Sequence, residues 1–299
     1  MSTASSADPG PTGRATPGSF AALGREGTGT TDAAGFVGEA VTLDWPEPDI
    51  ARATLTRGPA MNTLTLALLA EFGRALDEAV ARRARALIVT GSGRAFCCGA
   101  HLPYFTDPAS PFADAPLAIR EDYVGPIGRL FDRLEAMPFP TIAAVNGFAL
   151  GGGCELALAC DLRVLSADAT LGLPEVHVGA LPGAGGVQKL ARFVGRGRAL
   201  ELILLGRRLE AEEALSLGLA TAVAPPAELD QAVSGIVERL RRGGPLAIAY
   251  AKAMIYRCEG TDLRTARETG LDAVTVLAGS PEWREGMAAF GEKRPPRFE

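Results

Sequence analysis

Three short apolar runs, set between helical patterns, constrain the fold of this chain more than any other feature. They are "ALIVTG" (residues 86–91), "TIAAVNG" (141–147) and "LRVLS" (162–166). The first is typical of a strand buried on both faces, and the second repeats its rhythm of strand, turn and helix. Such runs belong to a parallel sheet covered by helices, so we predict an α/β fold.

Two further patterns flank the first run. Residues 50–57 alternate apolar and polar side chains, which predicts a half-buried strand. Thr65 is placed to cap a following amphipathic helix. The apolar stripe of that helix consists of Leu69, Phe72, Leu76 and Val80.

Strand patterns nearly vanish after Pro182. A helical stripe is expected to end at Gly195, and helical patterns continue from about residue 228 to 290. We therefore expect an α/β core followed by a helical C-terminal part. The stripe before Gly195 consists of Val187, Leu190, Ala191 and Val194.

Residues 1–38 differ in composition from the rest of the chain. They are rich in Gly, Ser, Thr, Pro and Ala and poor in large apolar side chains. Such a segment buries too little apolar surface to offset the entropy of ordering, so we predict a flexible low-complexity tail. The 299-residue chain as a whole is 47% hydrophobic, enough for a large core.

Charge and cysteine content exclude several classes of protein. The chain has 30 basic and 35 acidic residues, with no concentrated basic face for nucleic acid. No stretch is apolar enough to predict a membrane span or a signal peptide, so we expect a cytoplasmic protein without membrane partners. The five cysteines lack the paired spacing of a disulfide framework or a zinc site, and we expect no metal.

Glycines gather in three segments where the backbone turns sharply or closely approaches another group. They are "GSGRAFCCGA" (residues 91–100), "GFALGGGCE" (147–155) and "GALPGAGG" (179–186). The first does not have the spacing of a phosphate-binding P-loop, and the second lacks the spaced glycines of a dinucleotide fingerprint. Each segment alone indicates only a tight turn.

Together and in this order, the three segments resemble those of the crotonase family, the enoyl-CoA hydratase/isomerase superfamily. The resemblance runs from about residue 40 to 299 and includes the closing "REGMAAFGEKRPPRF". It implies a spiral of ββα units over residues 39–225. Residues 226–299 would form a helical C-terminal oligomerisation region, and the chain would assemble as a homotrimer or homohexamer.

The resemblance also implies a site. Members of the family bind an acyl-CoA thioester and stabilise negative charge on its carbonyl oxygen with two backbone N–H groups, which correspond here to Ala100 and Gly152. Gly152 opens a helix, where unpaired N–H groups favour an anion. Glu155 and Glu175 match the two catalytic acids of the hydratases, which implies that Glu155 deprotonates water and Glu175 donates a proton. Coenzyme A is then part of the substrate, and no cofactor is expected.

Other substrate contacts are less closely specified. The resemblance places coenzyme A near Ala60, His101 and Leu102. A cationic partner for its phosphates would be either Arg57 or Lys293, the latter reaching over from an adjacent subunit. His101 stands where the family usually has Asp, so we expect it to line the binding loop, with a chemical role as the alternative.

Alternatives to a hydratase remain open. The nearest is an isomerase that moves a double bond from position 3 to position 2, or a decarboxylase or lyase acting on the same enolate. A silent acyl-CoA-binding protein is the non-enzymatic alternative. A hydrolase would need a nucleophile such as Cys97 or Cys98 paired with His101.

Overall fold

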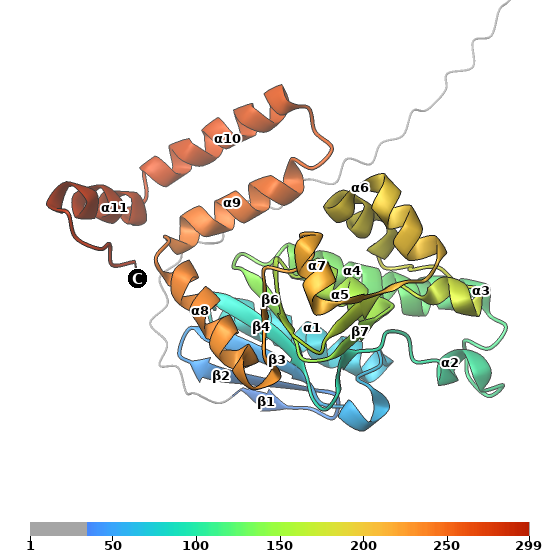
Figure 1. Cartoon of the computed structure of the whole chain (residues 1–299). Helices are drawn as coiled ribbons and strands as arrows, with labels where there is room; N and C mark the ends of the chain where they lie inside the picture. The colour runs from blue at the N-terminus through green and yellow to red at the C-terminus, as the bar shows by residue number, and fades with distance from the viewer. Residues whose placement is uncertain (1–34, 299) are drawn as a thin grey trace, which may run out of the picture. The chain divides into compact units, whose positions relative to one another are not determined.

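The computed structural model describes residues 35–298, and the three apolar runs form neighbouring strands of its larger sheet (Figure 1). Strands β3, β4, β6, β8 and β11 are parallel, whereas β1, β2 and β3 are antiparallel. In spatial order the sheet contains β1 (Phe36–Val37), β2 (Val41–Glu47), β3 (Ile50–Leu55), β4 (Ala86–Gly91), β6 (Thr141–Val145), β8 (Leu162–Ser166) and β11 (Ala222–Ala224).

A second sheet has four strands, and three of them are the strands that directly follow the three apolar runs in the chain. Its order is β10 (Arg208–Glu210), β9 (Thr170–Gly172), β7 (Phe148–Leu150) and β5 (Ala95–Cys97). The pairs β4 and β5, β6 and β7, and β8 and β9 thus each give one strand to each sheet before the chain turns helical. This repeated strand–strand–helix unit confirms the spiral that the sequence predicts.

Helices cover the large sheet on both faces, which explains its apolar central strands. One buried cluster joins α1 to the sheet through Phe72 and Leu76, and it continues to α4 and α5. A second cluster packs Val233 and Ile236 of α8 against Ile88 and Ile142. The helices of the core are α1 (Leu66–Ala81), α2 (Pro103–Thr106), α3 (Pro116–Ala118), α4 (Gly125–Glu135), α5 (Gly152–Ala159), α6 (Gly186–Leu204), α7 (Ala211–Ser216) and α8 (Leu229–Arg241).

Local signals for the first helix are largely confirmed. Thr65 is the N-cap of α1, and its side chain accepts a hydrogen bond from the backbone of Leu68. Leu69, Phe72 and Leu76 of the expected stripe are buried, but Val80 is 42% exposed because the helix ends one residue later.

Two expectations need correction. The break at Gly195 is real, with φ at 76°, but helix continues beyond it, so α6 extends to Leu204. Strands also occur after Pro182, because β10 and β11 are three-residue strands, too short to show a periodic pattern.

The expected tail is only partly described. Residues 1–34 lie outside the described part of the chain. Phe36 and Val37, at the inner end of the expected tail, form β1 and pair with Leu43 and Thr42 of β2.

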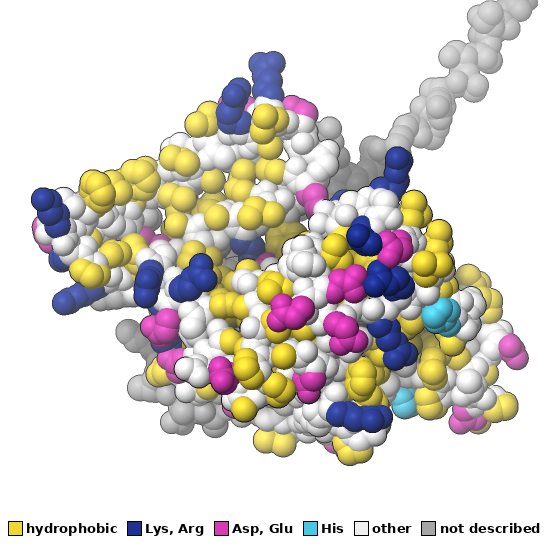
Figure 2. Space-filling view, viewed as in Figure 1, with side chains coloured by type: hydrophobic (Ala, Val, Ile, Leu, Met, Phe, Trp, Pro, Cys, Tyr) yellow, Lys and Arg dark blue, Asp and Glu magenta, His cyan; other side chains and the backbone are white. Residues whose placement is uncertain are grey.

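The last three helices bury few side chains in the single chain. They are α9 (Pro245–Arg257), α10 (Leu263–Ala278) and α11 (Pro281–Glu292). Ala273 is the buried residue of α10 and Ala289 that of α11, and Figure 2 shows apolar side chains spread over this part of the surface. None of the helices within residues 35–298 combines the length and apolar character needed to cross a membrane.

Candidate active site

Two glycine-rich segments meet where parallel strands β5 and β7 end. Cys97 of β5 is paired with Ala149 of β7, so the residues that follow each strand are neighbours. Gly99 fits only because it has no side chain, since a Cβ atom there would lie 2.7 Å from the backbone nitrogen of Gly152. Its φ of +78° also favours glycine. This close contact brings Ala100 and Gly152 to one place.

The backbone N–H groups of Ala100 and Gly152 are unpaired within the described part of the chain. Gly152 is the first residue of α5, and the N-cap Gly151 has no side chain to cap it. The free N–H group at the start of α5 carries partial positive charge, and together with the free N–H group of Ala100 it favours an anionic oxygen. The Leu64 side chain borders the site, 2.8 Å from the position that a Cβ atom on Gly152 would take.

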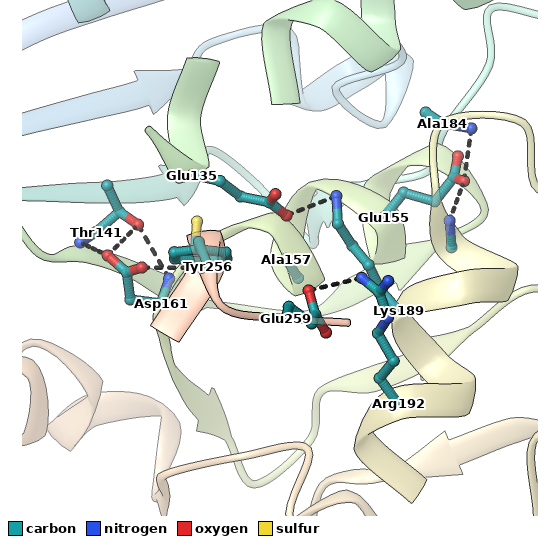
Figure 3. A network of polar contacts seen from close by, with 12 residues as sticks. Glu135, Thr141, Glu155, Ala157, Asp161, Ala184, Lys189, Arg192, Tyr256 and Glu259 are labelled. Atoms are coloured by element: carbon teal, nitrogen blue, oxygen red, sulfur yellow. Dashed lines mark hydrogen bonds and ion pairs between the residues drawn. The ribbon is translucent and has the colours of Figure 1, made fainter. Parts of the chain in front are cut away.

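Glu155 lies one turn into α5 and is only 3% exposed. Its Oε1 accepts hydrogen bonds from the backbone N–H groups of Ala184 and Gly186, each 2.8 Å long (Figure 3). The other oxygen, Oε2, lies 3.8 Å from the Cβ position of Gly152. Burial raises the pKa of Glu155, while these two hydrogen bonds and the charge of Lys189 lower it in part. One oxygen is thus fixed, and the other lies close to Gly152.

Glu175 reaches the same site from the other side of Gly151. It opens the short helix η4 (Glu175–Val178) after β9, and its Oε1 lies 3.0 Å from the Cβ position of Gly151. Its Oε2 is buried without a hydrogen-bond partner among the described residues. Burial raises the pKa of Glu175 to about 7, and the negative charge of Glu155 adds to the effect. The structure therefore brings together two acids that are twenty residues apart in sequence.

The loop after β5 is held by a residue that the sequence did not single out. Tyr123 of η3 (Ile119–Val124) is buried; its hydroxyl accepts from the backbone N–H of His101 at 2.9 Å and donates to the carbonyl of Leu64 at 2.6 Å. These bonds fix the backbone on both sides of Ala100. An isolated tyrosine carries no motif, so only the fold could identify it.

His101 lines this loop rather than facing a thiol. Its Nδ1 lies 3.0 Å from Thr63 Oγ1, and its ring packs edge-on against Tyr104. Burial and the nearby charge of Arg57 lower its pKa. Burial raises the pKa of Cys97 to about 12, and that of Cys98 is raised as well. Neutral thiols without a histidine partner do not favour nucleophilic hydrolysis.

Three other residues were expected to contact the substrate, and the structure places them as follows. Ala60 ends the short helix η2 (Gly58–Ala60) before α1, and Leu102 is 55% exposed just after His101. Lys293 is the C-cap residue of α11. Its contact with a substrate stays a prediction. Within residues 35–298 no cluster of side chains is suited to hold a metal ion.

The fold of two sheets, with unpaired backbone N–H groups near two buried acids, is the arrangement that the family resemblance predicts. The sequence profile of the enoyl-CoA hydratase/isomerase family matches residues 47–299. The chain belongs to this family and is an enzyme of it.

Named relatives and solved structures agree with the family. A crotonyl-CoA hydratase of Syntrophomonas wolfei is 38% identical over 84% of this chain and 95% of its own length. A short-chain-enoyl-CoA hydratase of Clostridium acetobutylicum is 36% identical over 83% of this chain and 93% of its own length. The crystal structure of an enoyl-CoA hydratase from Bacillus anthracis has a TM-score of 0.80 and 37% identity, covering 87% of this chain and 99% of that one.

Proposed function

We propose that the protein is an enoyl-CoA hydratase that adds water across the 2,3 double bond of an acyl-CoA thioester. One observation carries the proposal: the unpaired N–H group of Gly152, next to the loop that carries Ala100, lies close to two buried acids, with Glu155 Oε2 3.8 Å from the Cβ position of Gly152 and Glu175 Oε1 3.0 Å from that of Gly151. The names of the two hydratase relatives support the same reaction.

The proposed reaction divides two proton transfers between the acids. Water attacks C3 and gives a proton to Oε2 of Glu155, while the double-bond electrons move toward C2 and the thioester oxygen. The N–H groups of Ala100 and Gly152 stabilise the charge on that oxygen, and each such donor is typically worth about 3 kcal/mol of barrier. Glu175 donates a proton to C2, and exchange with solvent restores both acids. No cofactor is needed beyond the coenzyme A of the substrate.

The surroundings of the acids suit these roles. Burial raises the pKa of Glu155, but two hydrogen bonds and the positive charge of Lys189 oppose this rise and favour the carboxylate that a base needs. Glu175 has a buried oxygen without a partner and a pKa raised to about 7, so its protonated form is well populated near neutrality. Two acids whose environments differ in this way can act as base and acid at one pH.

Hydration of crotonyl-CoA, followed by loss of the conjugated thioester absorbance, tests the proposal. We expect Glu155→Gln and Glu175→Gln each to lower kcat by about 10²–10⁴-fold, the usual contribution of a proton-transferring side chain. Glu212→Gln, at an exposed position of α7, is the matched control and should keep wild-type activity.

Two other results would contradict the proposal. If crotonyl-CoA is inert and a 3-enoyl-CoA gains the absorbance, the protein is an isomerase. If acyl-CoA thioesters bind without turnover, the protein is a silent binding protein.

We also propose a homo-oligomer, a trimer or hexamer, in which α10 and α11 contact neighbouring subunits. Large apolar side chains on both helices support this, since they are exposed in the single chain. They are Leu263, Leu271, Val274, Val276, Trp283, Met287 and Phe290. Lys293, directly after α11, would then approach the coenzyme A of a neighbour, near Ala60, His101 and Leu102.

We further propose that the enzyme works in the cytoplasm. The five cysteines all lie in the described part of the chain and are all free, as expected in a reducing compartment. Recovery of the native protein in a secreted or organellar fraction would contradict this.

A further inference from the structure

The carboxyl group of Glu155 is held by the backbone that leads into α6. Its two hydrogen-bond donors, Ala184 and Gly186, lie on either side of Gly185, the N-cap of that helix. Gly186 also packs directly on the acid, since a Cβ atom there would lie 2.7 Å from Glu155 Cγ. Whatever fixes the first turn of α6 therefore also fixes Glu155.

Lys189 folds back onto that same turn. Its backbone N–H donates to the carbonyl of Gly185 at 2.9 Å, and its Nζ lies 3.3 Å from the Cβ position of Gly185. The ammonium group thus lies beside the backbone segment that donates two hydrogen bonds to Glu155.

An acid on another helix holds this ammonium in place. Glu135, the last residue of α4, forms an ion pair with Lys189 with an Nζ–Oε1 distance of 2.6 Å. The side chains are 14% and 19% exposed, so water screens the pair less than it screens a surface pair. Figure 3 shows Lys189 between Glu135 and Glu155.

Few charged groups act on Glu155 from the elements around it. Lys189 on α6 lowers the pKa of Glu155, whereas the carboxyl group of Glu175 on η4 has a pKa raised to about 7 and is largely protonated below that pH. The thiols of Cys97 on β5 and Cys154 on α5 are neutral, because burial raises the pKa of each to about 12. Lys189 therefore supplies positive charge to a buried acid that otherwise faces a second acid.

We propose that Lys189 is a positioning residue that keeps the carboxyl group of Glu155 ionised, and that Glu135 fixes and partly neutralises its ammonium. The inference rests on the proposed role of Glu155 as the base in hydration. Lys189 touches no reacting atom; it acts through Glu155 and through the turn that holds it.

The pH dependence of kcat/KM for hydration is the test. In Lys189→Met the acidic limb should move to higher pH by about 0.5–1 unit, because the variant loses a positive charge that lowers the pKa of Glu155. A nearby opposite charge lowers the pKa of a carboxyl group by about 1–3 units at contact and by less at longer range. Lys189→Arg should restore the wild-type limb. Arg192→Met removes a cation one turn further along α6, where Arg192 pairs with the exposed Glu259, and it should leave the limb unchanged.

A change at Glu135 should shift the acidic limb in the opposite direction. Glu135→Gln removes the partial neutralisation of Lys189, so the limb should move to lower pH. A role confined to packing would shift both variants in one direction or neither, and either pattern would overturn the inference. The double variant Glu135→Gln/Lys189→Met removes both charges of the pair, so neither is left without its partner, and it should still show the raised limb. The test therefore survives if the single lysine variant does not fold.

A measurement without substrate separates this inference from the proposed function. Infrared titration of the glutamate carboxylate band, with Glu155→Gln as the subtraction reference, reports the ionisation of Glu155 directly. We expect its midpoint to rise in Lys189→Met even if crotonyl-CoA is not hydrated. An unchanged midpoint in an active enzyme would refute the role of Lys189 alone.

Discussion

At the scale of single residues, burial rather than sequence position decides what each acid can do. Glu155 and Glu175 are the same residue type, yet one is bonded to two backbone N–H groups and the other leaves a buried oxygen unpaired. Hydrogen bonds to a carboxylate favour its charged form, whereas burial without partners favours the neutral form. The sequence identified both acids through a family resemblance but contained no information on this difference.

The raised pKa of Glu175 gives a prediction for pH. In the proposed reaction Glu175 donates a proton that is present below its pKa of about 7 and is lost as the pH rises through that value. We therefore expect kcat/KM for hydration to fall above about pH 7, approaching tenfold per unit, and Glu175→Gln to remove this limb from its residual activity. A rate that rises through pH 7 would instead make Glu175 the base.

At the scale of elements, the site depends on how closely α5 approaches β5. Gly153 is in the first turn of α5, and a Cβ atom there would lie 1.9 Å from the carbonyl oxygen of Cys97. The three consecutive glycines in the sequence indicate that another group closely approaches the backbone here. The sequence does not identify that group. Strand pairing between β5 and β7 supplies the answer, because it sets the carbonyl of Cys97 against the helix start.

Gly153→Ala tests this contact. The added methyl group must displace backbone rather than a flexible side chain, so we expect a loss of about 2–4 kcal/mol in the free energy of unfolding, together with reduced hydratase activity. Gly197→Ala is the matched control in α6, where nothing lies within 4 Å of the new Cβ atom. It should stabilise the protein by up to about 1 kcal/mol, measured by denaturant unfolding. Equal effects of the two changes would argue against a tight α5–β5 contact.

At the scale of the whole molecule, the described chain has an unequal distribution of buried apolar surface. The sheets and their helices bury large clusters, whereas Leu271 of α10 and Phe290 of α11 are 56% and 83% exposed. Side chains of this size on neighbouring helices are typical of a surface that another subunit covers.

The molar mass in solution, measured by light scattering, tests this assembly. We expect a value about three or six times the 31.0 kDa of the chain. The double variant Leu271→Glu/Val274→Glu should lower it toward the monomer, because charge opposes burial of the α10 surface. Asp272→Asn, on the same helix, should leave it unchanged. A wild-type protein that runs as a monomer would refute the proposed assembly.

The sequence by itself determined the strands β3, β4, β6 and β8, the helix α1 and the segments that carry the site. Apolar runs of strand length, the Thr65 cap and the helical stripes are local patterns, and each depends on residues close together in the chain. Short strands such as β10 and β11 were not predicted, because three residues are too few to show an alternating pattern of apolar and polar side chains.

Only the tertiary structure decided what those segments do to one another. Glu155 gains its two hydrogen bonds from residues 29 and 31 positions away, and Tyr123 binds a carbonyl 59 positions away. Burial and the charges of neighbours control the ionisation of an acid, and both arise when distant segments pack together. The unpaired amides, the raised pKa of Glu175 and the approach of Lys189 to Glu155 are therefore properties of the fold, which no local pattern encodes.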